Sequence, residues 1–226
     1  MDAAIAEFTE HGYAGTDAVG LCERAGIARS SFYSTFSSKD ALFERALARY
    51  TGRGAAERDA LVASPEPAPV VLRRRFTDAL GDQCARDDRA GCLSVNTAVE
   101  LGRSVDGVTA LLDADRGAWI DAYVRVLARG RGEGHVRPEL DPGTFGPLVH
   151  TTLAGLRVAA RVATPDEVRG QLDAFLAALS TDAGRAALAA SPAPSCPGEV
   201  PVAAGATPGA TTPARPDVAA NPAVTA

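Results

Sequence analysis

Residues 12–43 read GYAGTDAVGLCERAGIARSSFYSTFSSKDALF, and this stretch decides the fold. It predicts a helix over 17–25 that begins at a Thr16 cap and breaks at Gly26. A second short helix fits residues 28–34. Two short helices joined by a glycine-containing turn have the geometry that places the second helix in the major groove of DNA.

The side chains of the 28–34 helix suit a groove, because Ala28 and its serines are short enough to let the backbone approach base edges. Arg29 is long and forked, so it can reach guanine O6 and N7 or a phosphate. Thr16 and the helix N-terminus beside it offer a hydroxyl and N–H groups to a phosphate, and Tyr33 and Lys39 can hold flanking phosphates. The candidate DNA contacts are therefore Thr16, Arg29, Ser30, Ser31, Tyr33 and Lys39. Spacing alone is explained equally well by a helical hairpin with a polar face.

The order of these residues resembles the signature of the TetR (tetracycline-repressor) family of transcriptional regulators over roughly the first 45 residues. The matching pieces are Gly12-Tyr13, Thr16, Leu21 to Ile27, Ala28 to Ser31, Tyr33 to Phe36, and Ser38 to Leu42. The resemblance implies phosphate contacts from Thr16, Tyr33 and Lys39, and base contacts from Arg29, Ser30 and Ser31. It places Tyr13, Phe32 and Phe36 in the core. It further implies a helical second domain that senses a small molecule and pairs with a second subunit through its last two helices.

The charge balance and one residue depart from what DNA binding by this family favours. The net charge is −5, and residues 1–53 hold six Arg and Lys against seven Asp and Glu. Glu7 stands where the family has an apolar residue, and the chain starts inside the first helix of the family pattern. DNA contact must therefore come from the local placement of cations and not from a basic domain.

Helical patterns continue to about residue 183, with no sustained period-two pattern, so the predicted fold class is all-α. Apolar stripes mark a helix at 1–11, one at 39–53 capped by Ser38, one through Leu72 and Phe76, one with Val95 and Val99 inward, and the longest at 105–130. Asp141-Pro142 begins a helix with Phe145, Leu148 and Val149 on its stripe, and Thr164 to Glu167 has capping-box spacing. We predict a helix-turn-helix domain over 1–50, a ligand-binding and dimerisation domain over 51–183, and a disordered Pro/Ala/Thr-rich tail over 184–226.

The second domain offers aromatic side chains and one histidine for a mostly apolar ligand pocket. The candidate ligand-binding residues are Phe76, Trp119, Tyr123, Phe145 and His150. For each of them, ordinary core packing is the simpler explanation. The small residues Ala154, Gly155, Ala159 and Ala160 permit close approach of a helix from a second subunit.

Cys84 and Cys92 flank a short turn. They are near enough in sequence for a disulfide, and Cys92 could instead be a reactive thiol at a helix N-terminus. A redox-responsive repressor is therefore an alternative, as is a pair of buried inert cysteines. A helical interaction module that has lost DNA binding is a further alternative, because the N-terminal charge is acidic.

Enzyme motifs such as GxSxG, HExxH, the P-loop and a GxGxxG after a strand do not occur. The three histidines lack metal-ligand spacing, and no apolar run is long enough to span a membrane, so we expect no metal, no cofactor and a cytoplasmic location. The predicted function is a DNA-binding regulator, a homodimer on a pseudo-palindromic double-stranded operator, and a repressor released by a small-molecule inducer.

Overall fold

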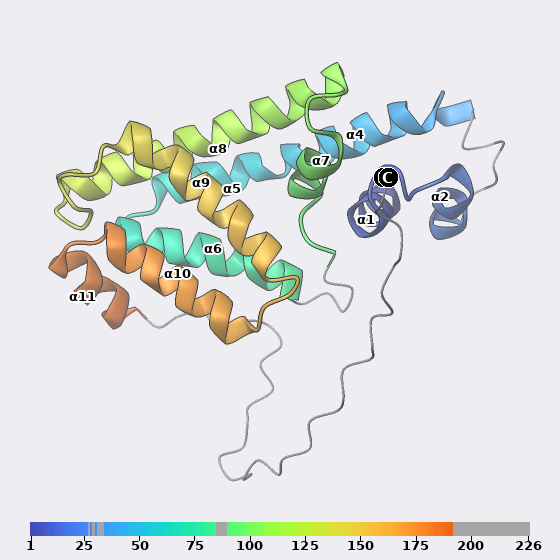
Figure 1. Cartoon of the computed structure of the whole chain (residues 1–226). Helices are drawn as coiled ribbons and strands as arrows, with labels where there is room; N and C mark the ends of the chain where they lie inside the picture. The colour runs from blue at the N-terminus through green and yellow to red at the C-terminus, as the bar shows by residue number, and fades with distance from the viewer. Residues whose placement is uncertain (27, 29, 31–33, 85–89, 192–226) are drawn as a thin grey trace, which may run out of the picture.

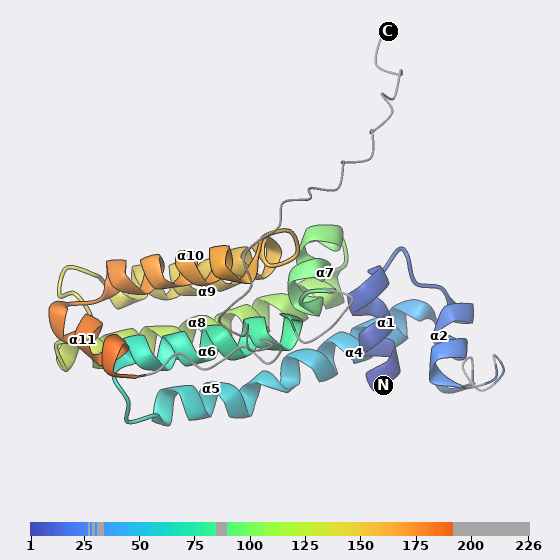
Figure 2. The same ribbon diagram turned by 90° about the horizontal axis from the view of Figure 1, so that it is seen from below.

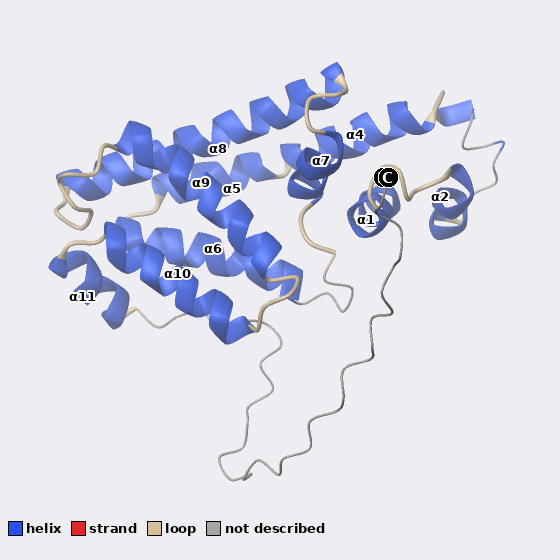
Figure 3. Cartoon of the chain, in the orientation of Figure 1, coloured by secondary structure: helices blue, strands red, loops and turns tan. Residues whose placement is uncertain are grey.

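The computed structural model describes residues 1–26, 28, 30, 34–84 and 90–191, and within these ranges every regular element is a helix (Figure 3). The helices are α1 (Asp2–His11), α2 (Ala18–Ala25), α4 (Lys39–Gly52), α5 (Gly54–Ala63), α6 (Ala68–Cys84), α7 (Leu93–Leu101), α8 (Asp106–Gly132), α9 (Pro142–Ala159), α10 (Pro165–Leu179) and α11 (Asp182–Ala190). The all-α prediction is confirmed. No helix in the described ranges is both long enough and apolar enough to cross a membrane.

The molecule is elongated, with α1 and α2 at one end and α11 at the other (Figure 1). α4 and α5 follow one another along its length and are separated only at Arg53, which ends one helix and begins the next. The view from below shows α6, α8, α9 and α10 gathered at the far end from α2 (Figure 2). The N-terminal helices are therefore joined to the larger helical body through α4.

Local caps fix most of the predicted helix boundaries. Ser38 caps α4 by accepting from the Ala41 N–H, and Gly26 ends α2 in the left-handed conformation with φ 64. Thr164 and Glu167 form the predicted capping box of α10. The cap of α2 differs from the prediction: it is Asp17, not Thr16, and its carboxylate accepts from the N–H groups of the first turn.

α8 and α9 pack closely because a glycine stands where they cross. A Cβ atom added at Gly146 would lie 3.3 Å from the Ile120 carbonyl oxygen of α8 and closer still to Val124. Any larger residue there would push α9 away. This contact helps build the larger of two apolar clusters, which includes Phe76, Tyr123 and Leu176.

The smaller cluster joins the two predicted domains. It is built around Phe8 and Phe43 from the N-terminal helices, but it also contains Leu93 of α7 and Val108 of α8. Each of these four side chains is at most 1% exposed. This apolar cluster therefore contains residues from both sides of the domain boundary predicted at residue 50.

Some predicted assignments were wrong. Val99 is 80% exposed and Leu148 is 45% exposed, because their neighbours Leu93, Thr97 and Val149 supply the buried faces of α7 and α9. α5 was not predicted, and α11 occupies residues placed in the tail. The rest of the predicted tail, and most of the helix predicted at 28–34, lie outside the described residues.

Candidate nucleic-acid interface

The predicted DNA contacts fall partly on residues that the structure describes. Ser30 is exposed and helical, whereas Arg29, Ser31 and Tyr33 lie outside the described residues. Thr16 is 1% exposed, and Lys39 is half-buried.

Thr16 closes the turn between α1 and α2. Its hydroxyl donates to the Gly12 carbonyl at 2.7 Å, while Asp17 accepts from the Val19 and Gly20 N–H groups at 2.9 and 2.8 Å. The hydroxyl proton and two N–H groups of this helix N-terminus are thus occupied within the protein. Contact of Thr16 with a phosphate remains a prediction.

Lys39 holds the same turn from the other side. Its Nζ donates to the carbonyl oxygens of Tyr13 and Thr16, each at 3.1 Å, and lies 4.2 Å from the centre of the Tyr13 ring. The Tyr13 hydroxyl donates to Asp40, and this bond is the main reason that the pKa of Tyr13 is raised to about 12. The turn of residues 12–17 is therefore fastened to the first turn of α4, next to the segment predicted to enter the groove.

Carboxylates pair with several cations of the N-terminal helices. Arg24 of α2 donates from Nε to Glu7 at 2.5 Å and also pairs with Glu10. Arg49 and Arg53 both pair with Asp2. The pair with Arg24 explains how a glutamate occupies position 7 although it is only 8% exposed.

Arg45 is a candidate phosphate contact that sequence reasoning missed. It is exposed on α4, and its guanidinium lies 5.0 Å from the centre of the Phe36 ring, next to the predicted groove helix. No local pattern distinguishes it from the other arginines of α4, so only the fold identifies it.

α7 connects the turn of residues 12–17 to the second domain. Glu100 accepts from the Tyr13 and Ala14 N–H groups at 2.7 and 2.6 Å, and Asn96 donates to the Thr9 carbonyl at 3.0 Å. Asn96 in turn accepts from Arg161, which follows α9, at 3.4 Å. A series of hydrogen bonds therefore runs from the end of α9 through α7 to the N-terminal helices.

Ligand binding by the five predicted residues stays a prediction, and the structure shows where each of them lies. Trp119 and Tyr123 are stacked, with ring centres 5.7 Å apart, and are 7% and 1% exposed. Phe76 is fully buried and stacks on Phe175 of α10 at 6.0 Å. Phe145 and His150 are half-buried on α9.

Arginines surround the Trp119–Tyr123 pair, a feature that sequence reasoning missed. Arg58 and Arg75 lie 5.3 and 4.2 Å from the Trp119 ring, and Arg58 pairs with Asp115 at 3.2 Å. Burial raises the pKa of Asp115 although Arg58 opposes the shift. These residues come from α5, α6 and α8, so no local sequence pattern could group them.

His150 responds to the same positive surroundings. Burial lowers its pKa most, and the charges of Arg116, Arg157 and Arg75 lower it further. Protonation of His150, which would add a further positive charge next to these arginines, is therefore disfavoured.

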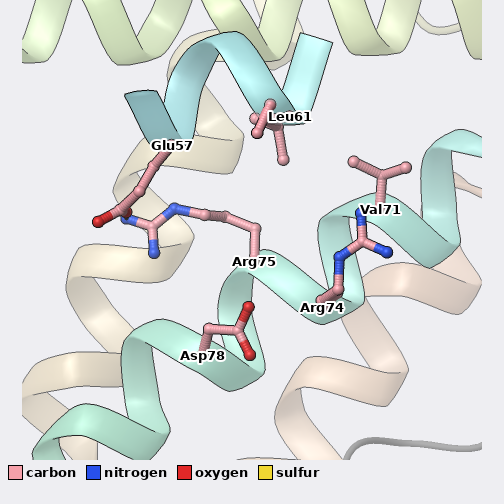
Figure 4. A pocket seen from close by; sticks show the side chains of 7 residues that line it. Glu57, Leu61, Val71, Arg74, Arg75 and Asp78 are labelled. Atoms are coloured by element: carbon pink, nitrogen blue, oxygen red, sulfur yellow. The ribbon is translucent and has the colours of Figure 1, made fainter. Parts of the chain in front are cut away.

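A cleft of about 320 Å³ opens between α5 and α6 (Figure 4). Its lining residues are Glu57, Ala60, Leu61, Val71, Arg74, Arg75 and Asp78. None of the five predicted ligand residues is among them, but Arg75 joins the cleft to Trp119.

Two cysteines, Cys22 and Cys92, are buried and free. The Cys92 sulfur accepts from Arg157 Nη1 at 2.8 Å and from the Tyr50 hydroxyl at 3.3 Å, at the residue that precedes α7. The side chain of Cys84 lies outside the description. Across the described ranges, no group of three or more His, Cys, Asp or Glu residues could hold a metal ion.

Two family models match the chain. The model for bacterial regulatory proteins of the tetR family matches residues 1–46, and the model for the tetracyclin repressor-like C-terminal domain matches residues 72–179. The HTH-type transcriptional repressor ComR of Escherichia coli is 24% identical over 162 residues, which cover 71% of this chain and 77% of the relative.

Solved structures share the fold. The regulatory protein TetR from Rhodobacter sphaeroides has a TM-score of 0.72 at 20% identity, covering 79% of this chain and 95% of the other. A cysteine mutant of the TetR family regulator CifR, complexed with 26-bp operator DNA, has a TM-score of 0.65 at 27% identity, covering 78% and 95%.

Proposed function

The chain belongs to the tetR family of bacterial regulatory proteins, and on that premise we propose that it is a sequence-specific repressor released by a small-molecule inducer. The observation that carries the proposal is the match of its N-terminal helices to the family, together with an exposed Ser30 on the helix predicted to enter the groove. The relative CifR has been solved with operator DNA bound.

A mobility-shift assay with the DNA upstream of the chain's own gene tests this function. We expect Arg29→Ala to weaken binding at least about tenfold, because a bidentate arginine contributes about 1–3 kcal/mol to base recognition. Arg137→Ala, at an exposed site in the second domain, is the matched control and should bind as the wild type does. A folded dimer with no affinity for this DNA would instead favour the interaction-module alternative.

We propose that the repressor is a homodimer built on the exposed faces of α9 and α10. Along α9, exposed and uncharged residues recur at helical spacing at Thr144, Leu148, Thr151, Gly155 and Val158, and the exposed Val162 follows in the turn after the helix. Val158 and Val162 are 50% and 87% exposed, and a Cβ atom at Gly155 would meet nothing within 4 Å. On α10 the exposed residues Gly170, Ala174, Ala177 and Ala178 are small, so another helix pair could approach closely.

Dimerisation matters because two recognition helices must sit roughly 34 Å apart to enter successive major grooves. Val158→Glu places a charge in the centre of the proposed interface and should give a monomer by light scattering, with loss of operator binding. Val99→Glu, at a side chain of α7 that is 80% exposed and outside the proposed interface, is the matched control and should remain a dimer. If Val158→Glu remains a dimer, these faces are not the interface.

An inducer would act by favouring an arrangement of the two DNA-binding units with the wrong spacing. The contacts of α7 support this route, because Asn96 and Glu100 bond to the N-terminal helices while Arg161 bonds to Asn96. Glu100→Gln keeps one acceptor oxygen and should weaken the coupling between inducer and DNA more than it weakens either binding alone.

A second candidate function is redox sensing through Cys92, favoured by the Arg157 guanidinium at 2.8 Å from its sulfur. The sulfur would attack the O–O bond of hydrogen peroxide and form a sulfenic acid, while the leaving hydroxide takes up a proton to become water. Peroxide should then release DNA from the wild type and from Cys22→Ser, but not from Cys92→Ser. Cys84→Ser tests whether oxidised Cys92 forms a disulfide with Cys84. If peroxide releases DNA from Cys92→Ser and from Cys84→Ser as it does from the wild type, the protein does not sense oxidants through these cysteines.

A further inference from the structure

From the α5–α6 cleft we infer that the effector is a small organic carboxylate, whose charged group binds Arg75 and whose apolar body lies on Ala60 and the edge of Leu61. This inference rests on the proposed function, since it names the chemical class of the inducer. It concerns the cleft of about 320 Å³, which is at the lower end of the size range of ligand pockets.

Arg75 is held in place but poorly neutralised. Its side chain is 12% exposed, its guanidinium lies 4.2 Å from the Trp119 ring, and its buried Nε has no hydrogen-bond partner among the described residues. The carboxylate that forms a recorded ion pair with it is Glu57, at 3.7 Å, with a side chain that is 56% exposed, while Asp78 also lines the cleft and Asp115 feels the charge of Arg75. A buried guanidinium needs closer compensation than a long ion pair with a solvated glutamate provides.

The surroundings of Arg75 add positive charge. Arg58 lies 5.3 Å from the Trp119 ring and pairs with Asp115, whose pKa is raised by burial. The pKa of His150 is lowered by burial and by the charges of Arg116, Arg157 and Arg75. An anion that enters beside Arg75 therefore meets the positive potential of these arginines, which the carboxylates of Glu57, Asp78 and Asp115 offset in part.

Ala60 supplies the exposed apolar surface of the cleft, whereas Leu61 and Val71 line it but are only 5% and 0% exposed. Figure 4 shows Arg75 extending toward Glu57. Arg74 also lines the cleft, but it pairs with Glu66 and is 45% exposed. A carboxylate can make two parallel bonds to a guanidinium, so it would displace the exposed Glu57 while the ligand body covers Ala60.

Trp119 makes the binding directly observable. It is the only tryptophan of the chain, and Arg75 lies on its ring, so its fluorescence reports on this site. Three probes with the same six-carbon body test the charge: hexanoate, hexanamide and hexylamine. We expect a saturable change with hexanoate and binding at least about tenfold weaker with the amide and the amine.

Arg75→Gln should weaken hexanoate binding at least about tenfold, whereas the matched control Arg74→Gln should stay within about threefold of the wild type. Circular dichroism checks the fold of both variants. If Arg75→Gln does not fold, Arg75→Lys serves in its place, and the comparison of the three probes on the wild type decides by itself. Equal binding of hexanoate and hexanamide, tighter binding of hexylamine, no saturable response to hexanoate, or full binding by a folded Arg75→Gln overturns the inference.

These titrations use the free protein and need no DNA. A protein that binds hexanoate but not its own upstream DNA would contradict the proposed function and leave the site intact. A protein that binds the DNA but not hexanoate would contradict only the site.

Discussion

One buried arginine of the second half differs from the paired arginines of the N-terminal helices. In the N-terminal helices, which are expected to meet a polyanion, Arg24, Arg49 and Arg53 are paired with carboxylates of α1. In the interior of the second half, Arg75 has a buried nitrogen without a hydrogen-bond partner among the described residues, and its pair with Glu57 is long.

The pairing of these arginines affects how the N-terminal helices can bind DNA. A DNA-binding unit with balanced charge gains little from nonspecific attraction, so we expect recognition to depend on a few exposed groups, such as the proposed contacts Ser30 and Arg45. The guanidinium of Arg75, in contrast, can still be neutralised by an anion that is not part of the chain. The predictions below test whether the halves are separate in stability as well as in charge.

The largest effect is expected at the core that the halves share. Leu93 is 1% exposed and belongs to α7, yet it packs with Phe8 and Phe43. Leu93→Ala should lower the free energy of unfolding by about 3 kcal/mol, because it removes buried carbon and leaves a cavity. Urea denaturation measures the loss, and a mobility shift measures the accompanying loss of operator affinity.

Leu176→Ala is the matched control in the larger cluster, where Leu176 is also 1% exposed. Its stability cost should be similar, but the folded variant should keep its operator affinity. If both variants weaken DNA binding equally at a temperature where both are folded, the smaller cluster has no special connection to the DNA-binding helices.

The next effect concerns the N-terminal helices and the ion pair between Arg24 and Glu7. Arg24→Ala leaves Glu7, which is 8% exposed, without its ion pair, and should cost about 2 kcal/mol of stability. Adding Glu7→Leu should recover most of this loss, because the uncompensated carboxylate is then gone. Urea midpoints of the two single variants and the double variant measure the coupling. Additive losses would mean that the pair does not stabilise this half.

Sequence reasoning succeeded where a residue acts on its immediate neighbours. Gly26, Ser38 and the capping box of Thr164 and Glu167 each control one helix end through contacts within three or four residues, so their positions could be predicted. The buried positions predicted for Val99 and Leu148 were wrong, because an apolar side chain on an exposed face gives the same local sequence pattern as one in the core.

The site could not be predicted where it depends on distant contacts. Glu100 meets Tyr13 across 87 positions, and Arg75 meets Trp119 from a different helix. α5 was missed because Gly52 and Gly54 suggest a break, while the structure uses Gly54 to bring the helix against Trp119. Such features appear only when the helices are packed.

A smaller effect distinguishes two roles of Lys39. Its bonds to the carbonyl oxygens of Tyr13 and Thr16 indicate that Lys39→Met will cost about 1 kcal/mol of stability. Arg45→Met, at an exposed site, should change stability by less than about 0.5 kcal/mol but reduce the salt dependence of DNA binding. If Lys39→Met weakens DNA binding without loss of stability, Lys39 acts mainly as a phosphate contact.

The smallest effect is a pH dependence from the arginines around His150 in the second half. Burial and the charges of Arg116, Arg157 and Arg75 lower the pKa of His150 below its usual 6.5, so the unfolded chain binds more protons than the folded one in that range. Stability is therefore complete above about pH 6.5 and falls as the pH drops through the lowered pKa of the folded state. His150→Gln should flatten this part of the curve of urea midpoints against pH, and Arg75→Gln should flatten it in part, because it removes one of the opposing charges. An unchanged or steeper curve in Arg75→Gln would mean that Arg75 does not add to the positive potential at His150, and would remove one support for an anionic ligand beside it.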